Sequence, residues 1–180
     1  MAQPNADVAA ERAVLAGILN FGSEGYHEVA DILAPNRTNF NGDPFTIDSN
    51  QVIYRCLEHI FKNDSDASID YASILSAANQ IGQGGFFAHP DEQKHLRAIS
   101  AYPVEKANLV KHAAVVKKLH LTRELRRQIQ DADRKLSEIT GQETLNSILG
   151  IPENAVFDFS ACLLDDRTEL KTIGVGLRDH

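Results

Sequence analysis

The chain has 180 residues, of which 43% are hydrophobic and 24% are charged, and its formal net charge is −7. This length supports one domain with its own core, or a domain with an appendage, and the composition excludes wholesale disorder. The negative net charge argues against a compact nucleic-acid-binding protein, although it does not exclude a local stripe of basic residues.

The cysteine content and the hydropathy of the chain indicate its cellular compartment. Cys56 and Cys162 lie far apart and form neither a CxxC pair nor a disulfide framework, which favours a reducing environment. No run approaches the roughly 18 apolar residues of a membrane span. The N-terminus also lacks the pattern of a secretory signal. We therefore expect a cytoplasmic protein.

Two helices are predicted near the N-terminus. The first runs from about Ala6 to Phe21, where Asn5 or Asp7 can cap it and Gly22 can end it. A second helix fits residues 25–33. The apolar face of the first helix comprises Ala10, Val14, Gly17, Ile18 and Phe21.

Two features of that first helix can be tested against a structure. Gly17 disfavours a helix interior by about 1 kcal/mol relative to alanine. Its place on the apolar face therefore predicts that another helix approaches closely there. Glu11 and Arg12 are expected to face solvent.

Three further helices complete a predicted bundle that ends near residue 103. The first, capped by Asp48 or Ser49, has the strongest amphipathic pattern in the chain. The next follows Ser68 or Asp70, and the last carries Pro90 in its first turn.

The longest predicted helix covers residues 105–139, which contain neither glycine nor proline. At about 1.5 Å per residue it is roughly 50 Å long, so part of it must project from a small core or meet a partner. We expect its first half to dock on the bundle. Its second half carries an apolar stripe at four-three spacing: Leu125, Ile129, Ala132, Leu136 and Ile139.

A helical hairpin is predicted to follow. Thr140 and Glu143 form a capping-box pattern that would open a returning helix. Gly150 and Pro152 should interrupt that helix, although Pro152 could restart it through Val156 and Phe157, so the returning helix would be too short to cover the whole stripe. The predicted fold is all-α: a helical bundle head at 1–103, a long helix and hairpin at 104–159, and the start of a linker at 160–180.

Four stretches carry a family resemblance: PNADVAAERAVLAGILN; HEVADILAPNRTNFNGDPF followed by VIYRCLEHIF; SIDYASIL; and GQGGFFAHPDEQKHLRAISAYPVEKANLVKHAAVVKKLHLTREL. In order and spacing they resemble the N-terminal domain of DnaB-type replicative DNA helicases, from about Pro4 to Leu136. Asn50 stands where many relatives carry histidine, the loop before it is long, and the second hairpin arm looks broken. These departures suggest a divergent relative, for which a phage-encoded helicase is one origin.

The resemblance implies a scaffold function. The domain would form the collar of a hexameric helicase, in which hairpins pair two subunits and three pairs build a ring. That ring would dock primase or a helicase loader and leave a channel for single-stranded DNA. The chain has no GxxxxGK[ST] phosphate loop. We therefore expect no cofactor in this chain, and ATP and Mg²⁺ only in a motor domain that it lacks.

The apolar stripe on the second half of the long helix is the candidate pairing surface. Basic side chains on the same long helix are candidates for partner or DNA contact, although a solvated helix face explains them as well: Lys117, Lys118, Arg123, Arg126 and Arg127. The GQGG turn lacks a phosphate-binding lysine, and histidine and aspartate spacings do not suit a metal, so neither a catalytic nor a metal site is expected.

Two alternatives remain open from the sequence alone. One is a stand-alone helical adaptor, such as a loader or a primase-side domain, that binds a helicase and has no motor. The other is a DNA-binding protein that uses its basic helix, for which affinity would fall steeply with salt.

Overall fold

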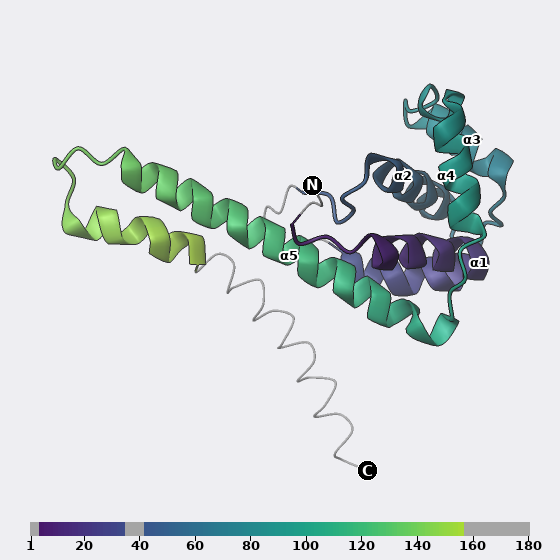
Figure 1. The fold of residues 1–180 in the computed structure, drawn as a ribbon, viewed down its shortest axis with the longest axis horizontal. Coiled ribbons are helices and arrows are strands. Elements are labelled where there is room, and N and C mark those ends of the chain that lie inside the picture. The colour runs from purple at the N-terminus through teal and green to yellow at the C-terminus, as the bar shows by residue number, and fades with distance from the viewer. Residues whose placement is uncertain (1–3, 35–41, 157–180) are drawn as a thin grey trace, which may run out of the picture. The chain divides into compact units, whose positions relative to one another are not determined.

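The computed structural model describes residues 4–34 and 42–156 of the chain. All regular structure in these residues is helical, which confirms the predicted all-α fold. The elements (Figure 1) are α1 (Val8–Leu33), α2 (Asp48–Asn63), α3 (Tyr71–Gln80), the short 3₁₀ helix η1 (Phe86–Ala88), α4 (Pro90–Ser100), α5 (Lys106–Ser137) and a helix over residues 145–156, which we call the returning arm.

The described residues fall into two compact units, which we call the head (residues 4–34 and 42–120) and the hairpin (residues 121–156). The first half of α5 therefore belongs to the head and its second half to the hairpin. This division lies further along the chain than the predicted boundary after residue 103. The predicted linker at 160–180 and the last residues of the predicted hairpin lie outside the described residues.

The head is built around α1, which packs against α2 and α4, while α2 also packs against α3. Each helix contributes large side chains that are fully or almost fully buried, and these form one apolar core: Val14, Leu15, Ile18, Ile53, Leu57, Ile74, Leu96, Ile99 and Leu109. Leu109 comes from the first half of α5, so that part of the long helix is held by the same core.

α1 consists of two helical segments that meet at Gly22. This residue has φ 63° and ψ −138°, a left-handed conformation that glycine adopts without a steric penalty. Asp7 caps the first segment, because its side chain accepts a hydrogen bond from the Ala10 N–H at 2.9 Å. Just past the kink, the Ser23 hydroxyl donates to the carbonyl of Ser65 at 2.6 Å. The predicted pair of helices and the break at Gly22 are confirmed.

Gly17 marks the close approach of α1 and α5. A Cβ placed on Gly17 would lie 2.3 Å from Cδ1 of Leu109, far inside van der Waals contact. Leu109 is fully buried. The predicted close approach of a second helix at this glycine is therefore confirmed, and that helix is α5.

The starts of the other head helices show which caps were predicted correctly. Asp70 caps α3 in a reciprocal capping box with Ser73, and Pro90 occupies the first turn of α4. The predicted cap of α2 is wrong: Ile47 stands at that position without a side-chain hydrogen bond, and Asp48 is already in the first turn. There its carboxylate interacts favourably with the positive end of the helix dipole, but it does not cap the helix.

The expectation that Glu11 faces solvent is also wrong, whereas Arg12 is exposed as predicted. Glu11 is 2% exposed, and its carboxylate accepts three hydrogen bonds. Oε1 accepts from the Thr46 N–H at 2.9 Å and from the Thr46 hydroxyl at 2.6 Å, and Oε2 accepts from the Asn50 side-chain amide at 2.9 Å. A buried carboxylate is tolerated when its lone pairs are satisfied in this way.

Asn50 extends this network from α2 to α4. Its amide nitrogen donates to Glu11, so its carbonyl oxygen accepts from Nε2 of His95 at 2.8 Å. Burial lowers the pKa of His95, and the positive charge of Arg12 lowers it further, whereas Glu92 opposes the shift. The chain of Glu11, Asn50 and His95 thus joins α1, α2 and α4 through polar contacts.

Candidate interaction surface

The predicted apolar stripe, which we call the α5 seam, comprises Leu125, Ile129, Ala132, Leu136 and Ile139, the last of which lies just past the end of α5. The structure separates these residues into covered and exposed positions. Ala132 is 6% exposed, and Leu125 and Ile139 are half-buried. By contrast, Ile129 is 51% exposed and Leu136 is 37% exposed. The second half of α5 therefore presents large apolar side chains that its own unit does not cover.

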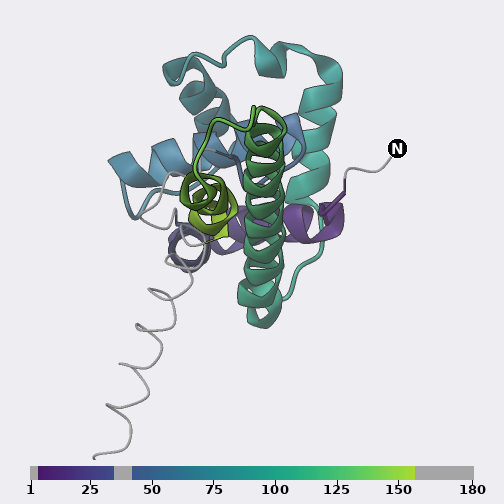
Figure 2. The same cartoon turned by 90° about the vertical axis from the view of Figure 1, so that its left-hand side faces the viewer.

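The returning arm runs beside the end of α5 (Figure 2) and is helical through Gly150 and Pro152. The predicted interruption of this helix is wrong. Proline in a helix interior removes one backbone donor, so the carbonyl of Ile148 loses its usual intrahelical partner, but the arm tolerates this loss. Glycine adds a conformational penalty of about 1 kcal/mol relative to alanine, which also does not end the helix.

The turn between the two helices differs from the predicted capping box. The backbone N–H groups of Thr140 and Gly141 donate to the Glu143 carboxylate, at 3.1 Å and 2.9 Å respectively, and Gly141 has φ 92°. Hydrogen bonds from backbone N–H groups, led by that of Glu143 itself, lower the pKa of this carboxylate. The helix instead begins after Thr144, whose hydroxyl accepts from the Ser147 N–H at 3.2 Å.

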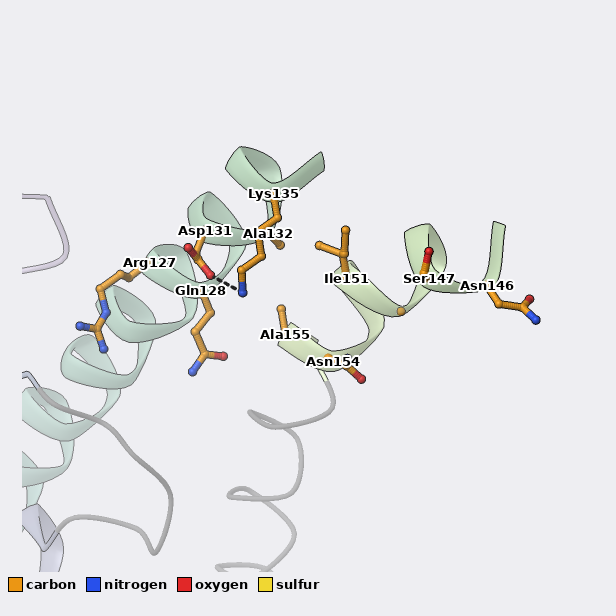
Figure 3. Close-up of a pocket in the computed structure, with 11 residues that line it drawn as sticks. Arg127, Gln128, Asp131, Ala132, Lys135, Asn146, Ser147, Ile151, Asn154 and Ala155 are labelled. Carbon is orange, nitrogen blue, oxygen red and sulfur yellow. Dashed lines mark ion pairs between the residues drawn. The ribbon is translucent and has the colours of Figure 1, made fainter. Parts of the chain in front are cut away.

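A groove of about 790 Å³ lies between α5 and the returning arm (Figure 3). Ala132 lines it from α5, and Ile151 and Ala155 line it from the arm. Most of the other lining side chains are polar or charged, from Arg127, Gln128, Asp131, Lys135, Asn146, Ser147 and Asn154. Apart from Ile151, the face of the arm that meets α5 is therefore small and polar, and Leu145, Leu149 and Val156 do not line the groove.

Those large residues form a second exposed stripe, which we call the arm seam: Leu145, Leu149, Pro152 and Val156. Leu145 is 78% exposed, Leu149 is 56% exposed and Val156 is 53% exposed, and Pro152 between them is exposed as well. Their spacing of four, three and four residues places them on one helix face. Sequence reasoning treated the arm as a cover for the α5 seam and missed this stripe, although the spacing was legible in the sequence.

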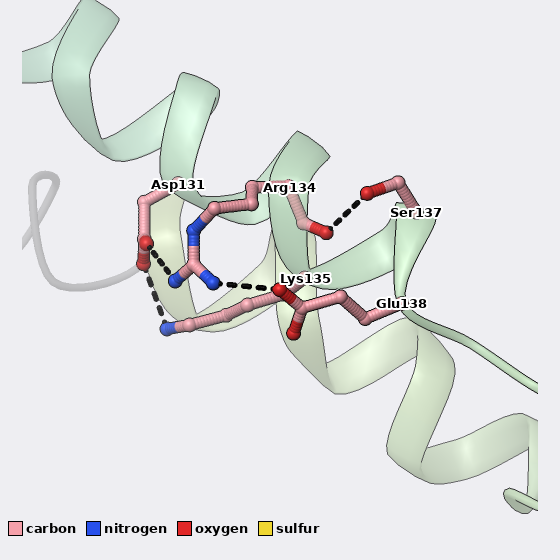
Figure 4. Close-up of polar contacts among 5 residues, drawn as sticks. All are labelled: Asp131, Arg134, Lys135, Ser137 and Glu138. Carbon is pink, nitrogen blue, oxygen red and sulfur yellow. Dashed lines mark hydrogen bonds and ion pairs between the residues drawn. The ribbon is translucent and has the colours of Figure 1, made fainter.

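Many charged side chains on the second half of α5 form ion pairs with one another (Figure 4). Asp131 pairs with Arg134 at 2.7 Å and with Lys135 at 2.8 Å, and Arg134 also pairs with Glu138 at 2.8 Å. Hydrogen bonds from Lys135 and Arg134 lower the pKa of Asp131. The charges within these pairs cancel. Because the pairs are exposed to solvent, they add little to the stability of the hairpin.

Among the five basic positions predicted for partner or DNA contact, Lys117 and Arg127 form the following contacts within the chain. Lys117 donates a hydrogen bond to the carbonyl of Ala34 at 2.6 Å. Its positive charge also interacts favourably with the negative C-terminal end of the α1 dipole. Arg127 forms an ion pair with Glu124, which is 5% exposed. Lys118 and Arg126 are exposed and Arg123 is half-buried. The hairpin has five basic and six acidic residues, which gives nucleic acid no net attraction to this unit.

The described part of the chain shows no other chemistry of its own. None of its helices is both long enough and apolar enough to cross a membrane. No group of three or more metal-ligating side chains gathers within residues 4–34 and 42–156. Cys56 is buried, which raises the pKa of its thiol to about 11 and makes it unreactive; Cys162 lies outside the described residues.

Comparison with known proteins decides the family. A sequence model of the DnaB-like helicase N-terminal domain matches residues 3–118, which is more than half of the chain. The chain belongs to the DnaB-like helicase N-terminal domain family. No curated protein matches the sequence.

The fold of this DnaB-like domain resembles the crystal structure of the N-terminal domain of DnaB helicase from Mycobacterium tuberculosis. The TM-score is 0.65 at 18% sequence identity, and the match covers 87% of this chain and 99% of that one. At this identity the comparison establishes a shared fold, and the surface residues of the DnaB-like domain must be interpreted from its own structure.

Proposed function

We propose that this domain forms part of the collar of a ring-shaped replicative DNA helicase and that two copies pair through their hairpins. Family membership supports the helicase context. The observation that carries the pairing is the set of exposed apolar residues on the hairpin: Ile129, Leu136, Leu145, Leu149 and Val156. Exposed apolar residues gathered in this way are typical of an interaction surface.

The energetics favour reversible pairing. A large apolar side chain contributes about 1.5–3 kcal/mol when it is fully buried. Because these five are 37–78% exposed, each has roughly half of that contribution still to gain. Ten such side chains from two copies then supply on the order of 10 kcal/mol, against association costs of about 4–15 kcal/mol. We expect the pairing of two isolated copies to depend on protein concentration, and assembly into a ring to strengthen this pairing.

The remaining parts of the proposal rest on the family resemblance. Three pairs would build the collar, which would dock primase or a helicase loader and leave a channel for single-stranded DNA. ATP and Mg²⁺ would bind to a motor domain outside this chain. Contact of a partner or DNA with Lys117, Lys118, Arg123, Arg126 and Arg127 stays a prediction, and the charge balance of the hairpin favours a protein partner over DNA.

Substitution of Ile129 tests the pairing. Ile129→Asp places a charge on the proposed interface, so the assembly state in sedimentation velocity should fall to a monomer at concentrations where the unmodified chain is larger. The matched control is Val110→Asp, because Val110 is 47% exposed on the same helix but belongs to the head. Circular dichroism should show unchanged helicity for both variants. Equal sedimentation of Ile129→Asp and the unmodified chain would reject hairpin pairing.

A further inference from the structure

We draw no further inference here: the strongest candidate, the exposed side of the first half of α5 that carries Val110, Lys111 and Val115, is a surface patch of the head for which nothing in the structure shows what covers it.

Discussion

Among single residues, Glu11 shows how a charged side chain can belong to the core. It lies three residues before Val14 and four before Leu15, so its position on α1 faces inward. Its charge suggested the opposite. The side chain is buried because Thr46 and Asn50, far away in sequence, supply three donors to it. Spacing within α1 identifies the inward face, but it cannot identify partners that only the folded chain brings together.

Replacement of Glu11 measures the value of those hydrogen bonds. Glu11→Leu removes the acceptor for three donors at similar volume, and should lower the free energy of unfolding by about 3 kcal/mol. Glu11→Gln should lower it by only about 1 kcal/mol, since its amide can bond to Asn50 once the Asn50 amide and the His95 tautomer reverse. Urea denaturation followed by circular dichroism measures both. The control Arg12→Gln should stay within about 0.5 kcal/mol of the unmodified chain.

A Leu variant as stable as the Gln variant would show that the network does not stabilise the head. The bonds would then serve only to fix the orientation of Asn50 and His95.

On the scale of elements, the packing of α1 on α5 depends on a missing side chain. Leu109 occupies the space that a Cβ on Gly17 would need. The first half of α5 is held to the head at this point, so Gly17 controls where the long helix sits within that unit. The penalty of glycine in a helix interior is offset by contact between the two helices.

Two glycine-to-alanine substitutions separate packing from helix propensity. Gly17→Ala should destabilise the chain by about 1–2 kcal/mol, since overpacking outweighs the propensity gain. Gly150→Ala is the matched control: a Cβ there meets nothing within 4 Å. Because Gly150→Ala changes only the helix propensity at that position, it should stabilise the helix by about 0.5–1 kcal/mol. Thermal unfolding of both variants measures the difference, and stabilisation by Gly17→Ala would contradict the packing argument.

Most helices could be predicted from the sequence because their signals are local. Asp70 and Ser73 cap α3 through a motif of four residues, and Gly22 breaks α1 through its own backbone freedom. The errors arise where two local signals compete. Thr144 caps the arm in place of Thr140, and the arm stays helical through Pro152. Sequence alone does not rank such competing signals.

For the whole molecule, the division into head and hairpin agrees with the family comparison. The family match ends at residue 118, and the head ends at His120. The head has a complete apolar core, whereas the hairpin exposes half of its large apolar side chains. The sequence predicted the α5 seam, but which seam residues stay exposed depends on how the arm packs, and periodicity does not contain that information.

Truncation tests whether the head is an independent folding unit. A chain that ends after His120 should unfold in one cooperative transition in urea and keep the helicity of α1–α4, because its core is complete. The isolated hairpin, residues 121–156, is smaller than the roughly 40 residues below which domains usually need disulfides, metals or oligomerisation. It should be largely unfolded at low concentration and gain helicity as it self-associates. A non-cooperative head would contradict this division.

The seven-residue repeat shared by both helices of the hairpin also restricts how its length can vary. Adding one repeat to α5 and one to the arm would extend the hairpin by about 10 Å while every apolar position kept its orientation. An insertion of one or two residues would instead rotate everything beyond it off the proposed pairing surface. In the proposed pairing, the length of the hairpin can therefore change only in whole repeats, made in both helices together.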